Sequence, residues 1–172
     1  MYLTKMLPVV GDDYEVHRKV MERFERPQRV LFQHTPTCLY VLSERPSSRA
    51  VGRQAEVDVD KLSLAGEQHF FSLRLNAARR SPGGGKRVSI PLPKMREWVS
   101  SKFARAGVEA DFDYSVEGTR RSRKGEATVS LQSVMVTGVL TVKDSSAFKQ
   151  ALCSGIGHAK GFGFGMLNVF SF

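Results

Sequence analysis

Tyr14 and His17 stand three residues apart in a segment with the apolar pattern of an amphipathic helix, so their side chains emerge side by side on one face. Histidine is the side chain best suited to proton transfer near neutral pH, with an ordinary pKa of about 6.5. Tyrosine can orient a reacting group or donate a proton to it. The pair is therefore a candidate for acid–base catalysis. A half-exposed helical histidine beside a tyrosine that packs on a strand is the structural alternative.

A glycine-rich stretch near the C-terminus carries five glycines at odd positions, namely Gly155, Gly157, Gly161, Gly163 and Gly165. Backbone without Cβ atoms can turn sharply and aim several N–H groups at one anion, for which phosphate is the natural candidate. Lys160 adds a positive charge, either facing a reacting phosphate or pairing with a bound backbone phosphate. We expect RNA contacts from His158 and from the first four of these glycines.

Two known motifs resemble this stretch only in part. A dinucleotide fingerprint needs G-x-G-x-x-G between a strand and a helix, but the expected third glycine position holds Lys160 and too little chain follows. Residues 160–167 nearly spell the aromatic strand signature of an RNA-recognition motif, which belongs on an inner strand followed by further elements. We exclude the first motif and treat the second match as accidental in detail.

Two basic clusters are predicted to contact RNA. The first, at the tip of a predicted two-stranded ribbon, comprises Arg120, Arg121, Arg123 and Lys124. The second, in a predicted loop, comprises Arg79, Arg80, Lys86 and Arg87. Arginine forks match phosphates and guanine edges, and the first cluster contains no acid, although such clusters are often only solvated turns. His34 and His69 are predicted to be structural or exposed.

Composition favours a polyanionic partner. The 172 residues carry a formal net charge of +9 and are 41% hydrophobic, enough for a packed core. The two cysteines, Cys38 and Cys153, have no Cys or His at zinc-ligand spacing. The sequence has no apolar run that could cross a bilayer. We therefore expect a nucleic-acid partner, no membrane association, no metal or other cofactor, and a cytoplasmic location.

The hydrophobic pattern predicts an α+β fold of tandem ferredoxin-like units. The first unit, residues 1–64, is abbreviated because no second helix is visible in it; its expected elements are strands over 2–10, 29–34, 38–43 and 55–59 and a helix over 13–24. The second unit, residues 65–172, is complete; its expected elements are strands over 67–76, 87–90, 108–117, 127–142 and 166–172 and helices over 93–107 and 144–153.

The two ends of the chain resemble one known family. The pattern G-I-G-x-x-K-x-F-G-x-G-x-L from Gly155, with the opening residues 2–8 and the segment from Asp13 to Arg18, is similar to the CasE family of CRISPR repeat-processing endoribonucleases. The resemblance implies tandem ferredoxin-like units, with a catalytic His at position 17 and a Tyr three residues earlier. It also implies that the basic hairpin of the second unit grips the stem-loop of a repeat.

The resemblance implies a reaction as well. The ribose 2′-OH upstream of the cut attacks the adjacent phosphorus without a metal, leaving a 2′,3′-cyclic phosphate and a 5′-OH. His17 would act as base or acid, and the enzyme would stay on its product as a subunit of the Cascade complex. The alternatives are a non-catalytic ferredoxin-like RNA-binding protein and a structural component of a ribonucleoprotein.

Overall fold

The computed structural model describes residues 1–24, 28–49, 52–81, 87–124 and 127–170. Its first sheet has the strand order β2-β3-β1-β4, in which β3 and β4 pair antiparallel with β1, and β2 with β3. This is the ferredoxin-like order. The elements of this part are β1 (Tyr2–Met6), α1 (Asp13–Arg23), β2 (Val30–His34), β3 (Leu39–Ser43), β4 (Arg53–Glu56) and α2 (Val59–Leu62).

The second sheet has the equivalent order β10-β5-β9-β8, again antiparallel throughout. Its elements are β5 (Gln68–Asn76), α3 (Met95–Arg105), β8 (Val108–Lys124), β9 (Ala127–Val142), α4 (Ser145–Ser154) and β10 (Leu167–Phe170). Inserted between them are β6 (Ala78–Arg80), β7 (Arg87–Ser89) and two 3₁₀ turns, η1 (Leu92–Lys94) and η2 (Lys160–Phe162). The predicted tandem ferredoxin-like architecture is thus confirmed.

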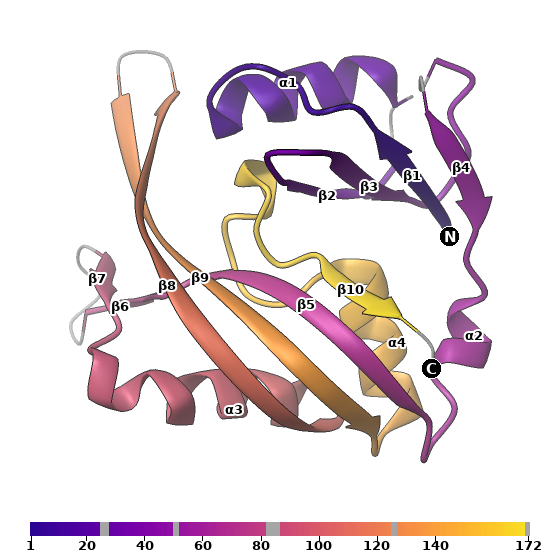
Figure 1. The fold of residues 1–172 in the computed structure, drawn as a ribbon, viewed down its shortest axis with the longest axis vertical. Helices are drawn as coiled ribbons and strands as arrows, with labels where there is room; N and C mark the ends of the chain where they lie inside the picture. The colour runs from indigo at the N-terminus through magenta and orange to yellow at the C-terminus, as the bar shows by residue number, and fades with distance from the viewer. Residues whose placement is uncertain (25–27, 50–51, 82–86, 125–126, 171–172) are drawn as a thin grey trace.

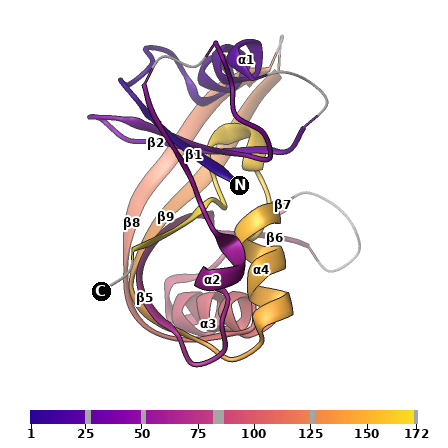
Figure 2. The same cartoon turned by 90° about the vertical axis from the view of Figure 1, so that its right-hand side faces the viewer.

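The elements stack in four layers, with α1 outermost at one end and α3 and α4 at the other, and with both sheets between them (Figures 1 and 2). Successive side chains of β3 point to opposite faces of the sheet and enter two different hydrophobic cores. Leu39 and Val41 pack under α1 with Val16, Val20 and other residues, whereas Leu42 faces the second sheet and packs with Leu31 and Met166. The largest core lies between the second sheet and helices α3 and α4.

The long β8–β9 hairpin rises past its own sheet and reaches the N-terminal end of α1 (Figure 1). The glycine-rich segment runs from α4 to β10, and its 3₁₀ turn η2 packs against α1 and β2. Three segments distant in sequence, α1, the β8–β9 hairpin and the glycine-rich segment, therefore surround one corner of the molecule.

The structure corrects several predicted boundaries. β4 ends at Glu56 rather than at residue 59, because Asp58 caps the short helix α2 by accepting hydrogen bonds from Asp60 and Lys61. Arg79, Arg80 and Arg87 belong to the paired strands β6 and β7 rather than to a loop. β8 continues to Lys124, through the predicted tip. Lys86 lies outside the described residues.

Candidate active site and nucleic-acid interface

The start of α1 fixes the orientation of Tyr14 and His17. Asp12 is the N-cap: its Oδ1 accepts hydrogen bonds from the backbone N–H groups of Tyr14 and Glu15, both at 2.9 Å. Glu15 completes a capping box by accepting the Asp12 N–H at 3.0 Å. Val16 and Val20 bury the opposite face of the helix, so Tyr14 and His17 lie half-buried at its edge.

The imidazole of His17 lies against the backbone of Gly161 in η2. A Cβ placed on Gly161 would be 3.7 Å from His17 Cε1, 3.8 Å from Nδ1 and 3.9 Å from Nε2. The ring also stacks near Phe32, with centroids 6.0 Å apart and planes at 27°. Tyr14 lies 6.5 Å from His17 and 6.4 Å from Phe162, centroid to centroid. Both predicted catalytic side chains of α1 thus adjoin the glycine-rich segment.

The glycines of this segment serve mainly to fold it. Gly155, Gly157, Gly163 and Gly165 have positive φ angles, and a Cβ on Gly165 would lie 2.4 Å from the carbonyl oxygen of Ile156. The segment closes on itself through the hydrogen bond from Ile156 N–H to Gly165 O, 2.8 Å long. Gly163 is buried against Phe32. The predicted RNA contact at Gly163 is therefore wrong, because this residue faces the interior.

Arg120 is held within the protein. Its guanidinium forms two hydrogen bonds with the Asp13 carboxylate, one of them 2.9 Å from Nε to Oδ2. Only 5% of the Asp13 side chain is exposed, against 32% of Arg120. One residue earlier in α1, the Asp12 Oδ2 accepts the backbone N–H of Arg123 at 2.9 Å. The N–H groups of Arg123 and Glu15 lower the pKa of the Asp12 carboxyl.

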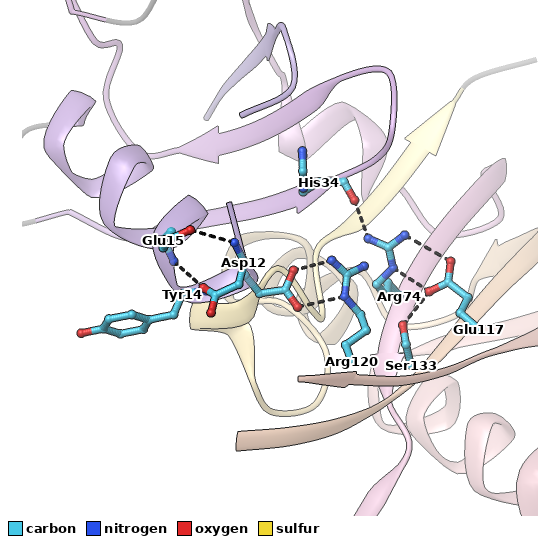
Figure 3. A network of polar contacts seen from close by, with 9 residues as sticks. Asp12, Tyr14, Glu15, His34, Arg74, Glu117, Arg120 and Ser133 are labelled. Atoms are coloured by element: carbon cyan, nitrogen blue, oxygen red, sulfur yellow. Dashed lines mark hydrogen bonds and ion pairs between the residues drawn. The ribbon is translucent and has the colours of Figure 1, made fainter. Parts of the chain in front are cut away.

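A second polar cluster continues from this contact across the two sheets (Figure 3). Arg74 donates to both oxygens of Glu117, at 2.9 and 3.2 Å, and to the carbonyl of His34 at 2.6 Å. Burial opposes ionisation of Glu117, but the hydrogen bonds from Arg74 and Ser133 outweigh it and lower the pKa of that carboxyl. His34 is structural, as predicted: its Nε2 is buried without a partner in the described residues, and burial lowers its pKa.

Most of the other basic residues predicted to contact RNA are exposed to solvent. Arg121 and Arg123 are exposed on the β8–β9 hairpin, and Arg79, Arg80 and Arg87 on the β6–β7 hairpin. The side chain of Lys124 lies outside the described part of the chain. Arg120 is the exception, because its guanidinium belongs to Asp13 rather than to the free surface.

A cavity of about 480 Å³ lies between the two hairpins and the glycine-rich segment. Asn76, Arg87, Gln132, His158 and Phe162 are among its lining residues. Asn76 Nδ2 contacts His158 Nε2 at 3.1 Å, and its Oδ1 accepts the Gln132 N–H at 3.0 Å. Burial, with the charges of Arg87 and Lys102, lowers the pKa of His158 to about 4. His158 is therefore neutral near pH 7.

Lys160 lines a different cavity, which lies between α3 and α4 together with Lys102 and Arg105. Sequence reasoning missed these two cations of α3, as it missed Asp13 as a buried partner and Asn76 as the anchor of the segment. A half-buried cation has no signal in a helical pattern. Among the residues described, no three His, Cys, Asp or Glu side chains are grouped to hold a metal ion, and no helix is long and apolar enough to cross a membrane.

Comparisons with known proteins agree with this arrangement. A family model described as CRISPR associated protein matches residues 5–170. The CRISPR system Cascade subunit CasE of Escherichia coli is 28% identical, with 98% of each chain covered. A CRISPR-associated endoribonuclease, Cse3 of Thermus thermophilus, is 29% identical over 60% of this chain and 56% of its own length.

Solved structures show the same fold. The endoribonuclease Cse3 bound to a 19-nucleotide RNA superposes with a TM-score of 0.83 at 22% identity, covering 99% of this chain and all of the other. Cas6e of Escherichia coli superposes with a TM-score of 0.79 at 23% identity, with full coverage of both chains. Because the family model spans nearly the whole sequence, the chain belongs to the family of CRISPR-associated proteins.

Proposed function

We propose that this protein is a metal-independent endoribonuclease that cleaves CRISPR repeat RNA at the base of its stem-loop. The observation that carries the proposal is the contact of the His17 imidazole with Gly161, in a corner that the basic β8–β9 hairpin reaches through its contacts with α1. Two relatives whose names describe a Cascade subunit and a CRISPR-associated endoribonuclease support it. A Cβ at Gly161 would lie at van der Waals distance from the ring, so the glycine keeps its own side-chain atoms away from the imidazole.

The reaction requires one proton to leave the attacking 2′-OH and one to reach the departing 5′-oxygen. The 2′-oxygen forms a bond to phosphorus while the bond from phosphorus to the 5′-oxygen breaks, giving a 2′,3′-cyclic phosphate and a 5′-OH. His17 makes one of these transfers, and Tyr14 orients the phosphate or donates a hydrogen bond to it. Acid–base assistance of this kind is worth about 10²- to 10⁴-fold in rate.

The hairpins would grip the stem. An A-form stem hides its base edges in a deep groove, so recognition depends on shape, phosphates and 2′-OH groups. Arg121 and Arg123 are exposed for this purpose, as are Arg79 and Arg80, and Arg87 lines the cavity beside His158. Lys160 lines the cavity between α3 and α4 together with Lys102 and Arg105. This position favours a role for Lys160 in binding backbone phosphate over direct stabilisation of the transition state.

The proposal also covers the division of the chain into two units and the complex in which the enzyme acts. Residues 1–64 form the unit that carries the catalytic helix, and residues 65–172 form the unit that carries the basic hairpin and the glycine-rich segment. The enzyme remains on its product in the cytoplasm as a Cascade subunit, bound to the other subunits of that complex.

The direct test incubates the protein with a repeat hairpin RNA in excess EDTA and identifies the product ends. We expect one cut at the base of the stem, with 2′,3′-cyclic phosphate and 5′-OH ends. The same RNA with a 2′-deoxyribose upstream of the cut should bind equally well and stay intact. Unrelated stem-loops should remain uncut. Intact repeat RNA would favour a non-catalytic RNA-binding protein, and magnesium-dependent cleavage would overturn the mechanism.

A further inference from the structure

A basic groove lies on the face of the second sheet that α3 and α4 cover. Its volume is about 360 Å³, and its lining runs from Ala147 to Ser154 along α4 and then through Gly155 to Lys160. The stretch from Ala147 to Ser154 spans about 10 Å of helix axis. The groove is therefore longer than a single phosphate group.

Three cations line this groove, namely Lys102, Arg105 and Lys160, and no acidic residue does. None of the three forms an ion pair with another residue of the described chain. Lys102 is half-buried, and burial together with the charge of Arg105 lowers its pKa. Like charges held together without a counter-ion cost stability, so an anion in the groove would be bound favourably.

The negative C-terminal ends of two helices offset only part of the positive charge of the groove. The C-termini of α3 and α4 both lie at the groove, and each contributes roughly half a negative charge. Two such ends offset about one of the three cations, leaving a surplus of about two positive charges. Lys102 also lies over the Trp98 ring, 5.2 Å from its centroid, which fixes the side chain without neutralising it. The groove keeps a positive potential.

The groove reaches the proposed point of cleavage. Lys160 is the first residue of η2, and the next residue, Gly161, contacts the imidazole of His17. His158, two residues before Lys160, has its pKa lowered by burial and also by the charges of Arg87 and Lys102, which belong to the β6–β7 hairpin and to α3. Positive potential thus extends from one side of the glycine-rich segment to the other.

From this geometry we infer that the groove formed by Lys102, Arg105 and Lys160 binds the phosphates of the single-stranded RNA that continues past the cut, away from the stem. The inference rests on the proposed function, because it takes the scissile phosphate to lie beside His17. The strand beyond the base of the stem is unpaired, and its backbone must pass η2 on one side. The α3–α4 groove offers it cations there, while the hairpins face the stem.

The test compares binding of three RNAs that share one repeat hairpin and carry zero, two or six nucleotides past the cut. The RNA with zero nucleotides ends at the cut and has no scissile bond, and the two longer RNAs carry a 2′-deoxyribose upstream of the scissile phosphate, so that none is cleaved. The proteins are wild type, Lys102→Gln/Arg105→Gln, and the matched control Lys94→Gln/Arg96→Gln, which removes two cations from the other end of the same region, outside the groove. Thermal unfolding verifies that each variant is folded.

We expect wild type and the control variant to bind the six-nucleotide RNA about tenfold more tightly than the blunt hairpin. The groove variant should bind both alike, with its hairpin affinity unchanged. For the groove variant and the extended RNA, the slope of the logarithm of the binding constant against the logarithm of the salt concentration should be smaller by about 0.7 for each phosphate that the groove no longer binds. Equal weakening of all three RNAs, or no change in any, would overturn the inference. Failure of wild type to bind the blunt hairpin would instead refute the proposed function.

Discussion

Arg120 and Asp13, 107 residues apart in sequence, form a two-point ion pair that joins the β8–β9 hairpin to the first turn of α1. Asp13 is adjacent to Tyr14 and lies one helical turn before His17, so this contact ties the proposed RNA-gripping hairpin to the proposed catalytic groups. The neighbouring hydrogen bond from Arg123 N–H to Asp12 strengthens the same junction.

Removing one partner of this pair should destabilise the protein. In Arg120→Gln the Asp13 carboxylate stays buried without its counter-charge, which typically costs 3–5 kcal/mol; because Arg120 is 32% exposed, we expect about 2 kcal/mol. The measurement is urea unfolding of Arg120→Gln, Asp13→Asn and the double variant. The double variant should lose at least about 1 kcal/mol less than the sum of the singles. Strict additivity would show that the pair does not couple the two elements.

The glycines should differ sharply in their tolerance of alanine. Gly165→Ala places a Cβ 2.4 Å from the Ile156 carbonyl at a φ of +82°, so we expect a loss of more than about 2 kcal/mol. Gly161→Ala meets only ordinary contact distances to His17, and its stability should stay within about 1 kcal/mol of wild type. Thermal unfolding checks both variants. Similar midpoints would contradict the packing described for this segment.

Acidification should weaken the fold through His158. Its folded-state pKa of about 4 is below the unfolded value of about 6.5, so the unfolded chain binds more protons between these pH values. The stabilisation is complete above about pH 6.5 and is lost as the pH falls towards 4. His34, whose pKa is also lowered, adds to the same slope.

His158→Gln should therefore have a shallower stability profile than wild type. Urea unfolding at several pH values between 7 and 5 is the measurement, since that range lies above the ordinary pKa values of the carboxyl groups. Parallel profiles for wild type and His158→Gln would show that His158 is not held neutral by its surroundings.

The exposed arginines of the β8–β9 hairpin should contribute electrostatic affinity for the stem. Arg121→Gln/Arg123→Gln is expected to weaken hairpin binding and to reduce the log–log salt slope by about 0.9 for each phosphate that the hairpin no longer neutralises, the value known for duplex DNA. Stability should be unaffected, because both side chains are exposed. An unchanged salt slope would assign the grip on RNA to another surface.

The pattern of apolar residues was sufficient for the fold because β5 carries apolar alternation through Phe71, Leu73 and Leu75, and α1 carries a helical apolar stripe with Val16 and Val20. Asp12 caps this helix, and Glu15 completes the capping box. The sequence could not reveal that β8 extends through the arginine cluster to Lys124, since those residues have the composition of a turn. These residues are in a strand because the backbone of β8 pairs with β9 as far as Lys124.

The site was only partly predictable. The family resemblance singled out His17 and the glycine-rich segment separately, and the structure places them in contact at Gly161. The pairing of Arg120 with Asp13 could not be predicted, because the two residues are 107 positions apart in sequence. Lys102 and Arg105 were hidden in the last turns of a helix, where cations are common for reasons unrelated to ligands.

The most direct test of the central claim compares single-turnover cleavage of repeat hairpin RNA by wild type and His17→Ala in EDTA, with hairpin affinity measured in parallel on the 2′-deoxy RNA. If the imidazole beside Gly161 transfers a proton in the reaction, cleavage should slow by about 10²- to 10⁴-fold while affinity stays within about threefold. Cleavage by His17→Ala within tenfold of the wild-type rate would contradict the account.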